Sequence, residues 1–306
     1  MRSFILTLIF SFFFVSSAQA VQCKRLHIGY VNWSDVEATT ALAEVLLEQV
    51  GYRVRTSQNT VPGTLEKLAN QEIDIFLGNW MPSNEENVRP FFDSGKIIPL
   101  ATNLTGAKYT LAVPTYVYDA GVKNFADLAA HRDKFGGRIF GLESGNDGNL
   151  LIQGMISKNA FGLKDFKLMA SSERIMLAQL KKRIRNNQWM AFLAWEPHPM
   201  NVNFDIRYLE GGDDFFGPNL GESRVETLVR SGFEQECPQA AELLKRLTFT
   251  LDMENSLMAD ISENFSDPKS AAWRWIAANP QQVNTWLTGL TLPQGKTVEQ
   301  VIAAFE

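Results

Sequence analysis

Two side chains with complementary chemistry lie close together near the start of the sequence, Trp33 and Asp35. The face of an indole attracts a cation without needing a hydrogen-bond donor, and a nearby carboxylate adds a negative charge. The pair therefore suits a cation that carries no N–H group. In a purely structural alternative, Ser34 and Glu37 form an S-x-x-E capping box at a helix start. Asp35 would then complement the helix dipole, and Trp33 would be a core residue.

Two further tryptophans each end a predicted buried strand and open a Trp-x-Pro sequence. Trp80 is followed by Pro82, and Trp195 by Pro197. Because proline cannot extend a strand ladder, it leaves the indole at the carboxyl end of the strand. Ligands of open α/β sheets bind outside these ends. We therefore expect the two indoles to face each other across a cleft, the alternative being that each packs in its own core.

A tyrosine and an asparagine are the remaining candidates for ligand contacts. Tyr109 begins another predicted strand, and Asn146 lies in the glycine-rich turn 144–149, which opens a helix. The turn lacks the phosphate-loop pattern, but an asparagine there can hydrogen-bond a ligand hydroxyl or carboxylate. Asn146 and Asp147 are equally suited to cap the helix.

Residue patterns for catalysis or metal binding are weak. The three histidines, His27, His131 and His198, have no metal-ligand partner at i+4. The serine that follows 141–143 comes one position too late for the G-x-S-x-G motif. We expect His198, which stands between two prolines, to be an exposed surface residue. The sequence predicts neither an enzyme nor a metal site.

The elements that must position these residues alternate between strand and helix. A first run has strands predicted at 25–31, 52–56 and 73–79 and helices at 34–50 and 63–70. A second run has strands at 138–142, 166–170 and 190–194 and helices at 147–159 and 173–185. Strands at 97–103, 109–113, 205–209 and 225–229 and four C-terminal helices complete the pattern. This order is typical of α/β proteins with parallel sheets flanked by helices.

The doubled run predicts two lobes with a ligand cleft between them, each lobe a mostly parallel sheet flanked by helices. We expect lobe I to be discontinuous, formed by 21–112 plus 204–306, and lobe II to be formed by 113–203. Two crossings between lobes make a hinge, which commonly closes around a ligand.

The N-terminus has the pattern of an export signal. Arg2 precedes an apolar run at 5–15, and 18–20 is a small-x-small cleavage site. The apolar run is too short to span a membrane, so we expect 1–20 to be removed as a signal peptide. Without Arg2 the formal net charge changes from −5 to −6. The short basic run at 181–185 is expected to be a solvated helix face, and no nucleic-acid partner is predicted.

Export also affects the two cysteines, Cys23 and Cys237. An oxidising compartment allows them to form a disulfide. Closing so long a loop would stabilise the fold by roughly 4–5 kcal/mol in the chain-entropy model. Two unrelated buried thiols are the alternative.

Taken together, these features resemble the choline-binding proteins of bacterial ABC importers. These form part of the glycine betaine, proline betaine and carnitine substrate-binding group, which has a type II periplasmic-binding fold. The resemblance covers essentially the whole mature chain and rests on Asn32-Trp33-Ser34-Asp35, Gly78-Asn79-Trp80-Met81-Pro82, Tyr109, Ser144-Gly145-Asn146 and Ala194-Trp195-Glu196-Pro197.

The resemblance implies a role for each matching residue. The rings expected to cage a trimethylammonium group are those of Trp33, Trp80, Tyr109 and Trp195. Asp35 would lie beside the cation and Asn146 at the choline hydroxyl, while Cys23 and Cys237 would form the family's disulfide.

The implied function is a periplasmic binding protein that captures choline between closing lobes and delivers it to the membrane permease of an ABC transporter. We expect a monomer without a cofactor. Asp35 favours choline, because the carboxylate of a zwitterionic betaine or carnitine would need a matching donor. The alternatives are a protein of this family that prefers glycine betaine or carnitine, a periplasmic enzyme acting on a choline ester, and a module that reports to a receptor.

Overall fold

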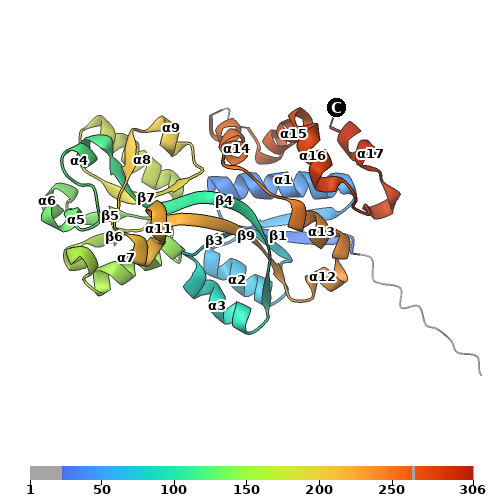
Figure 1. The fold of residues 1–306 in the computed structure, drawn as a ribbon, viewed down its shortest axis with the longest axis horizontal. Coiled ribbons are helices and arrows are strands. Elements are labelled where there is room, and N and C mark those ends of the chain that lie inside the picture. The colour runs from blue at the N-terminus through green and yellow to red at the C-terminus, as the bar shows by residue number, and fades with distance from the viewer. Residues whose placement is uncertain (1–22, 264–265, 306) are drawn as a thin grey trace, which may run out of the picture.

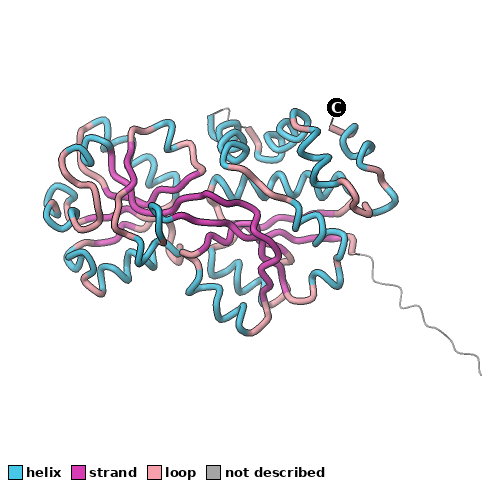
Figure 2. The backbone as a smooth tube through the Cα atoms, viewed as in Figure 1, coloured by secondary structure: helices cyan, strands magenta, loops and turns pink. Residues whose placement is uncertain are grey.

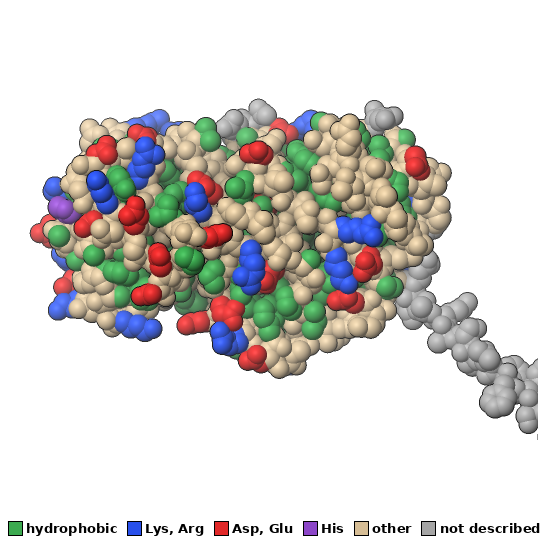
Figure 3. Space-filling model, viewed as in Figure 1, with side chains coloured by type: hydrophobic (Ala, Val, Ile, Leu, Met, Phe, Trp, Pro, Cys, Tyr) green, Lys and Arg blue, Asp and Glu red, His purple; other side chains and the backbone are tan. Residues whose placement is uncertain are grey.

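A computed structural model describes residues 23–263 and 266–305 of the chain (Figure 1). The expected signal peptide, residues 1–20, lies outside the described residues. Within the described ranges, nine strands form one curled sheet, and helices cover it on both sides (Figure 2). The chain thus has the α/β class predicted from the sequence. On the face shown in Figure 3, acidic and basic side chains are interspersed.

The strands are β1 (Arg25–Tyr30), β2 (Arg53–Gln58), β3 (Ile75–Met81), β4 (Ile97–Pro114), β5 (Arg138–Phe140), β6 (Lys167–Met169), β7 (Ala191–Glu196), β8 (Ile206–Tyr208) and β9 (Glu222–Arg230). They are ordered β2-β1-β3-β9-β4-β7-β5-β6, and β8 pairs with β4. The outer groups, β2-β1-β3 and β7-β5-β6, are parallel, as the two β-α-β runs predict. Between them, β9 and β4 are antiparallel to each other and to their neighbours.

The longer helices are α1 (Ser34–Val50), α2 (Val61–Ala69), α3 (Glu85–Asp93), α7 (Asp147–Ser157), α8 (Glu173–Arg185), α13 (Pro238–Arg246), α14 (Leu251–Glu263), α15 (Pro268–Ala278) and α16 (Pro280–Leu287). The shorter ones are α4 (Thr115–Asp119), α5 (Asp127–Ala130), α6 (Arg132–Phe135), α9 (Met200–Asn203), α10 (Asp213–Phe216), α11 (Pro218–Gly221), α12 (Phe233–Glu236) and α17 (Val298–Ala303). In the described ranges no helix is both long and apolar enough to cross a membrane.

Two halves surround the central antiparallel pair (Figure 1). We call the group of β1–β3 with α1–α3 and α12–α17 the first half, on the right of the figure. The group of β5–β7 with α4–α9 is the second half, on the left. Strands β4 and β9 run from one towards the other, so the halves share a sheet.

Strand β4 is one strand of 18 residues, whereas the sequence pattern predicts separate strands at 97–103 and 109–113. Its register against β9 shifts three times, and Gly106 adopts a positive φ of 75°. These irregularities bend the strand without ending it. At Lys108 the strand changes partner, because this residue faces Glu222 of β9 and Glu196 of β7.

Helix α1 has the predicted bounds and ends at Gly51, whose φ of 116° is accessible to glycine. The expected capping box is wrong. Trp33 is the N-cap residue and offers no side-chain cap, and Ser34 is already the first helical residue. From that position its hydroxyl cannot reach the free N–H groups of the first turn, and Ser34 Oγ is buried without a partner.

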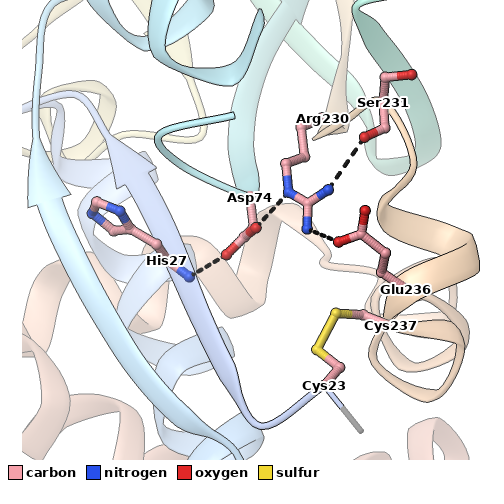
Figure 4. Close-up of a disulfide and its surroundings, with 7 residues drawn as sticks. All are labelled: Cys23, His27, Asp74, Arg230, Ser231, Glu236 and Cys237. Carbon is pink, nitrogen blue, oxygen red and sulfur yellow. Dashed lines mark hydrogen bonds and ion pairs between the residues drawn. A yellow bond between two sulfur atoms is a disulfide. The ribbon is translucent and has the colours of Figure 1, made fainter. Parts of the chain in front are cut away.

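The predicted disulfide between Cys23 and Cys237 is confirmed (Figure 4). It links Cys23, two residues before β1, to Cys237, the residue before α13, and the two are 214 positions apart. Beside it, Arg230 forms ion pairs with Asp74 (Nε–Oδ1 2.7 Å) and Glu236 (Nη2–Oε2 2.5 Å). This cluster fastens the C-terminal helices to the first strands.

Candidate functional site

The ends of β3, β5 and β7, the starts of α1 and α7 and the middle of β4 surround one small cavity. Its lining residues are Trp33, Asp35, Trp80, Tyr109, Leu142, Asn146, Asp147 and Trp195. All six residues predicted to contact a ligand are therefore brought together, and Leu142 and Asp147 join them. The space between atoms measures about 230 Å³.

Aromatic rings belong to four of the eight residues that line the cavity. The centroids of Trp80 and Tyr109 are 5.9 Å apart at an interplanar angle of 56°, and those of Tyr109 and Trp195 are 6.4 Å apart at 82°. The rings thus stand at angles to one another. Trp33 and the other three rings are each at most 6% exposed and belong to the continuous core. The same four rings therefore pack in the core and line the cavity.

Asp35 is the acidic group among these rings, placed by the first turn of α1. Its Oδ2 accepts a hydrogen bond from Trp80 Nε1 at 3.0 Å, while its Oδ1 is buried without a partner. Burial, reinforced by the nearby Glu173 carboxylate, raises the pKa of Asp35 to about 7. A buried carboxylate with an unpaired oxygen is costly unless an opposite charge approaches it.

Asn146 joins the helix α7 to the aromatic wall. Its Oδ1 accepts the Asn149 N–H at 2.9 Å, which confirms the predicted helix cap. The same oxygen accepts the Tyr109 hydroxyl at 3.1 Å. Its Nδ2 donates one hydrogen to Asp147 Oδ1 at 3.1 Å, and within the described residues the second hydrogen has no acceptor. That hydrogen remains available to a ligand oxygen.

Asp147 is a second buried carboxyl in the cavity, predicted from the sequence only as a helix cap. The hydroxyl of Ser83, which follows β3, donates to its Oδ2. Burial raises the pKa of Asp147 to about 6, although the Ser83 hydrogen bond opposes this. The bond also joins the first half to the second.

Two more carboxylates of the second half accept hydrogen bonds from the first. Trp33 Nε1 donates to Glu143 Oε1 at 2.9 Å, and the Ser34 backbone N–H donates to Glu173 Oε2 at 3.0 Å. Burial raises the pKa of Glu143. Neither glutamate was predicted, because each partner lies more than a hundred positions away in the sequence.

His198 is buried, so its prediction as a surface residue is wrong. Its ring packs edge-on against Trp195, with centroids 4.7 Å apart, and the residue is 4% exposed. The Met200 N–H donates to Nδ1 at 2.8 Å, so the proton lies on Nε2, which donates to Glu173 Oε1 at 3.1 Å.

The cavity is acidic and aromatic. None of the described residues that line it is a lysine or arginine. Elsewhere in the described residues, no group of three His, Cys, Asp or Glu side chains is arranged to hold a metal ion. The arrangement can enclose a small cation, and the Asn146 amide can donate one hydrogen bond to an oxygen of that ligand.

Comparison with known proteins gives a consistent result. Residues 24–278 match the family model for the substrate binding domain of ABC-type glycine betaine transport systems. An ABC-transporter choline binding protein, solved with choline, is 44% identical with a TM-score of 0.91, covering 93% of this chain and 99% of that chain. Lactococcal OpuAC, solved closed with glycine betaine, is 26% identical with a TM-score of 0.78, covering 86% and 99%. A Chromohalobacter salexigens protein of uncharacterised function is 48% identical over 135 residues, 44% of this chain and 87% of its own length.

Proposed function

The chain belongs to the family of substrate-binding domains of ABC-type glycine betaine transport systems, and on this premise we propose that its substrate is choline. The protein would hold choline in the cavity between its halves and deliver it to the membrane permease of an ABC importer. We further propose that the binding residues are Trp33, Asp35, Trp80, Tyr109, Asn146 and Trp195.

The observation that carries this proposal is the unpaired oxygen of Asp35 inside an aromatic cavity. A trimethylammonium group spreads its charge over methyl groups, so it gains from apolar burial and from cation–π attraction together. Each ring contributes up to about 2 kcal/mol when water is excluded. Micromolar affinity needs only about 8 kcal/mol, which four rings and a carboxylate can supply.

Choline is favoured over glycine betaine by the charges of the cavity. Asp35 and Asp147 both line it, and its described lining contains no basic side chain. The carboxylate of a betaine would approach two acidic groups without a cationic partner. The choline hydroxyl, in contrast, can accept the remaining hydrogen of the Asn146 amide.

The proposal also covers where the protein works and which parts of it move. We propose that the protein works as a monomer in the periplasm after removal of 1–20, and that lobe I (21–112 plus 204–306) and lobe II (113–203) close around the ligand. The boundary at 112 falls inside β4, just after its change of partner at Lys108. The second crossing, at 203/204, falls between α9 and β8. Bending at these two crossings would therefore form the hinge.

Calorimetry on residues 21–306 tests the substrate. We expect choline to bind more tightly than glycine betaine, and Trp195→Ala to lose most of the choline affinity while the fold survives. Trp273→Ala, which changes a partly exposed tryptophan of α15 outside the cavity, is the matched control and should bind as the wild type does. Tighter binding of glycine betaine, or unchanged binding by Trp195→Ala, would contradict the proposal.

An enzyme acting on a choline ester is the alternative from another class. The family is one of transport substrate-binding domains, and both ring nitrogens of His198 are engaged by protein groups. Incubating the purified protein with acetylcholine separates the two functions. Turnover that disappears in His198→Gln would favour the enzyme.

A further inference from the structure

Glu173 connects the two halves without lining the cavity. It is the first residue of α8 in the second half, and its side chain is 13% exposed. One carboxylate oxygen accepts the Ser34 backbone N–H of the first half, at 3.0 Å. The other accepts His198 Nε2 of its own half, at 3.1 Å. Both oxygens are therefore used, one on each side of the interface.

The contact with Glu173 supplies a hydrogen-bond acceptor at the N-terminus of α1, which the helix's own cap residue does not provide. The N-cap residue Trp33 has no capping side chain, and Ser34 Oγ makes no hydrogen bond. An acceptor and a negative charge at a helix N-terminus stabilise its free N–H groups and its dipole. For this 17-residue helix the acceptor is the Glu173 carboxylate of the opposite half.

On the other side, Glu173 reaches the aromatic wall through His198. The imidazole proton is directed at Glu173 because Nδ1 is occupied by the Met200 N–H. The ring in turn packs against Trp195. The Glu173 carboxylate thus joins the first turn of α1 to His198, the residue that packs against the Trp195 indole.

We propose that Glu173 is a positioning residue for ligand retention, which locks the start of α1 to the His198–Trp195 pair and so keeps the cavity closed around its occupant. This inference rests on the proposed function. The lock needs two acceptor oxygens on one side chain of the right length, because it serves two donors that face it from different halves.

Two substitutions of Glu173 prevent one side chain from accepting both hydrogen bonds, each in a different way. Glu173→Gln keeps the size but has only one acceptor oxygen, and its NH₂ group opposes the His198 Nε2–H. Glu173→Asp keeps the charge but is one methylene too short to reach both donors. We expect both variants to release choline about tenfold faster, which corresponds to about 1.4 kcal/mol, with the association rate within about twofold of wild type.

Stopped-flow tryptophan fluorescence on the full mature chain measures both rates. Glu37→Gln is the matched control, because Glu37 lies in the first turn of the same helix and makes no hydrogen bond to the second half among the described residues. It should release choline at the wild-type rate. Equal acceleration in Glu37→Gln would assign the effect to distant charge and overturn the proposal, as would wild-type release by both Glu173 variants.

Thermal unfolding separates a lock from a fold-stabilising contact. If Glu173 acts as a lock, its variants lose part of the increase in melting temperature that choline produces, in addition to any decrease that they cause without choline. A lower melting temperature without choline, together with unchanged release, would overturn the proposal.

Hydrogen exchange provides a readout that does not depend on the ligand assignment. The amides of 34–37 should exchange faster in Glu173→Gln than in wild type or Glu37→Gln, with and without choline. Failure of choline to bind the wild type would contradict the proposed function alone. Unchanged exchange at 34–37 would contradict the role of Glu173 alone.

Discussion

Asp35 has an unusual environment for a carboxylate. It is 3% exposed, and one of its oxygens has no protein partner among the described residues. Asp147 lies beside the same cavity and is equally buried. Both groups are more easily protonated than ordinary aspartates, since burial disfavours the charged form. A cation in the cavity reverses that preference.

This environment predicts how choline binding depends on pH. The pKa is about 7 for Asp35 and about 6 for Asp147 without ligand. Binding of a cation favours the ionised carboxylates and therefore releases protons. We expect affinity to fall as the pH drops from about 7 to 5, by up to about tenfold per unit for each group, and to level off above about pH 8.

Calorimetry at pH 5, 6, 7 and 8 in buffers of different ionisation enthalpy measures both the affinity and the released protons. Asp35→Asn should bind choline at least about tenfold more weakly at pH 8, because it removes a buried charge next to the cation. It should also show a shallower pH dependence. An affinity independent of pH between 5 and 8 would show that neither group titrates on binding.

The same pKa values fix the sign of stability against pH. An aspartate in the unfolded chain titrates near pH 3.9, so between about pH 4 and 7 the unliganded native state binds more protons than the unfolded chain. The contribution of Asp35 to stability is therefore fully present below about pH 4 and is lost as the pH rises through about 7. Choline opposes this loss because it binds the ionised form.

At the level of elements, the first turn of α7 comes very close to Tyr109. A Cβ built on Gly148 would lie 2.2 Å from the Tyr109 hydroxyl oxygen, whereas one built on Gly154 of the same helix meets nothing within 4 Å. Alanine is otherwise favoured over glycine within a helix, by about 1 kcal/mol.

We therefore predict opposite results for two similar substitutions. Gly148→Ala should displace the Tyr109 ring and weaken choline binding by about tenfold or more, because one wall of the cage moves. Gly154→Ala, the control, should keep the affinity and raise the free energy of unfolding by about 0.5–1 kcal/mol. Calorimetry and urea unfolding measure the two effects. Wild-type affinity in Gly148→Ala would mean that the position of Tyr109 is unimportant.

The sequence revealed the parts of the site that obey local rules. Trp80 and Trp195 could be found because proline marks the end of each strand. That these indoles meet across one cavity follows from strand direction. Asp147 was recognised only as a helix cap, because a carboxylate in a first helical turn already has a local explanation.

Other features depend on distant contacts that no local pattern carries. Glu143 and Glu173 bond to partners 110 and 139 positions away, so their place behind the cavity follows only from the way the halves meet. His198 lies in a turn between two prolines, and this local sequence does not predict that its ring packs against Trp195. Strand β4 looked like two strands, because Gly106 and its neighbours interrupt the strand pattern locally while both ends continue in one sheet.

For the whole molecule, the disulfide affects stability more than binding. It lies before the first residue of β1, whereas the cavity lies beyond the last residue of that strand. Replacing both Cys23 and Cys237 by serine should lower the free energy of unfolding by roughly 5 kcal/mol in the chain-entropy model. Choline affinity should stay within about twofold.

Guanidinium unfolding and calorimetry of the double serine variant check this expectation. The cysteine-containing protein, unfolded with and without a reductant, serves as the control for the substitutions themselves. A large loss of affinity with little loss of stability would mean that the bond shapes the cavity and does not merely restrain the unfolded chain.

The path of the chain through the sheet has a consequence for biosynthesis. The strands of the second half, β5 to β7, come from one continuous stretch, whereas β3 of the first half pairs with β9, and Cys23 with Cys237. A chain that crosses a membrane N-terminus first can thus assemble the second half while its tail is still inside the cell. The first half must wait for nearly the whole polypeptide, with Cys23 exposed as a free thiol until Cys237 emerges. In the proposed export, the earliest part of the protein to appear is therefore among the last to be completed.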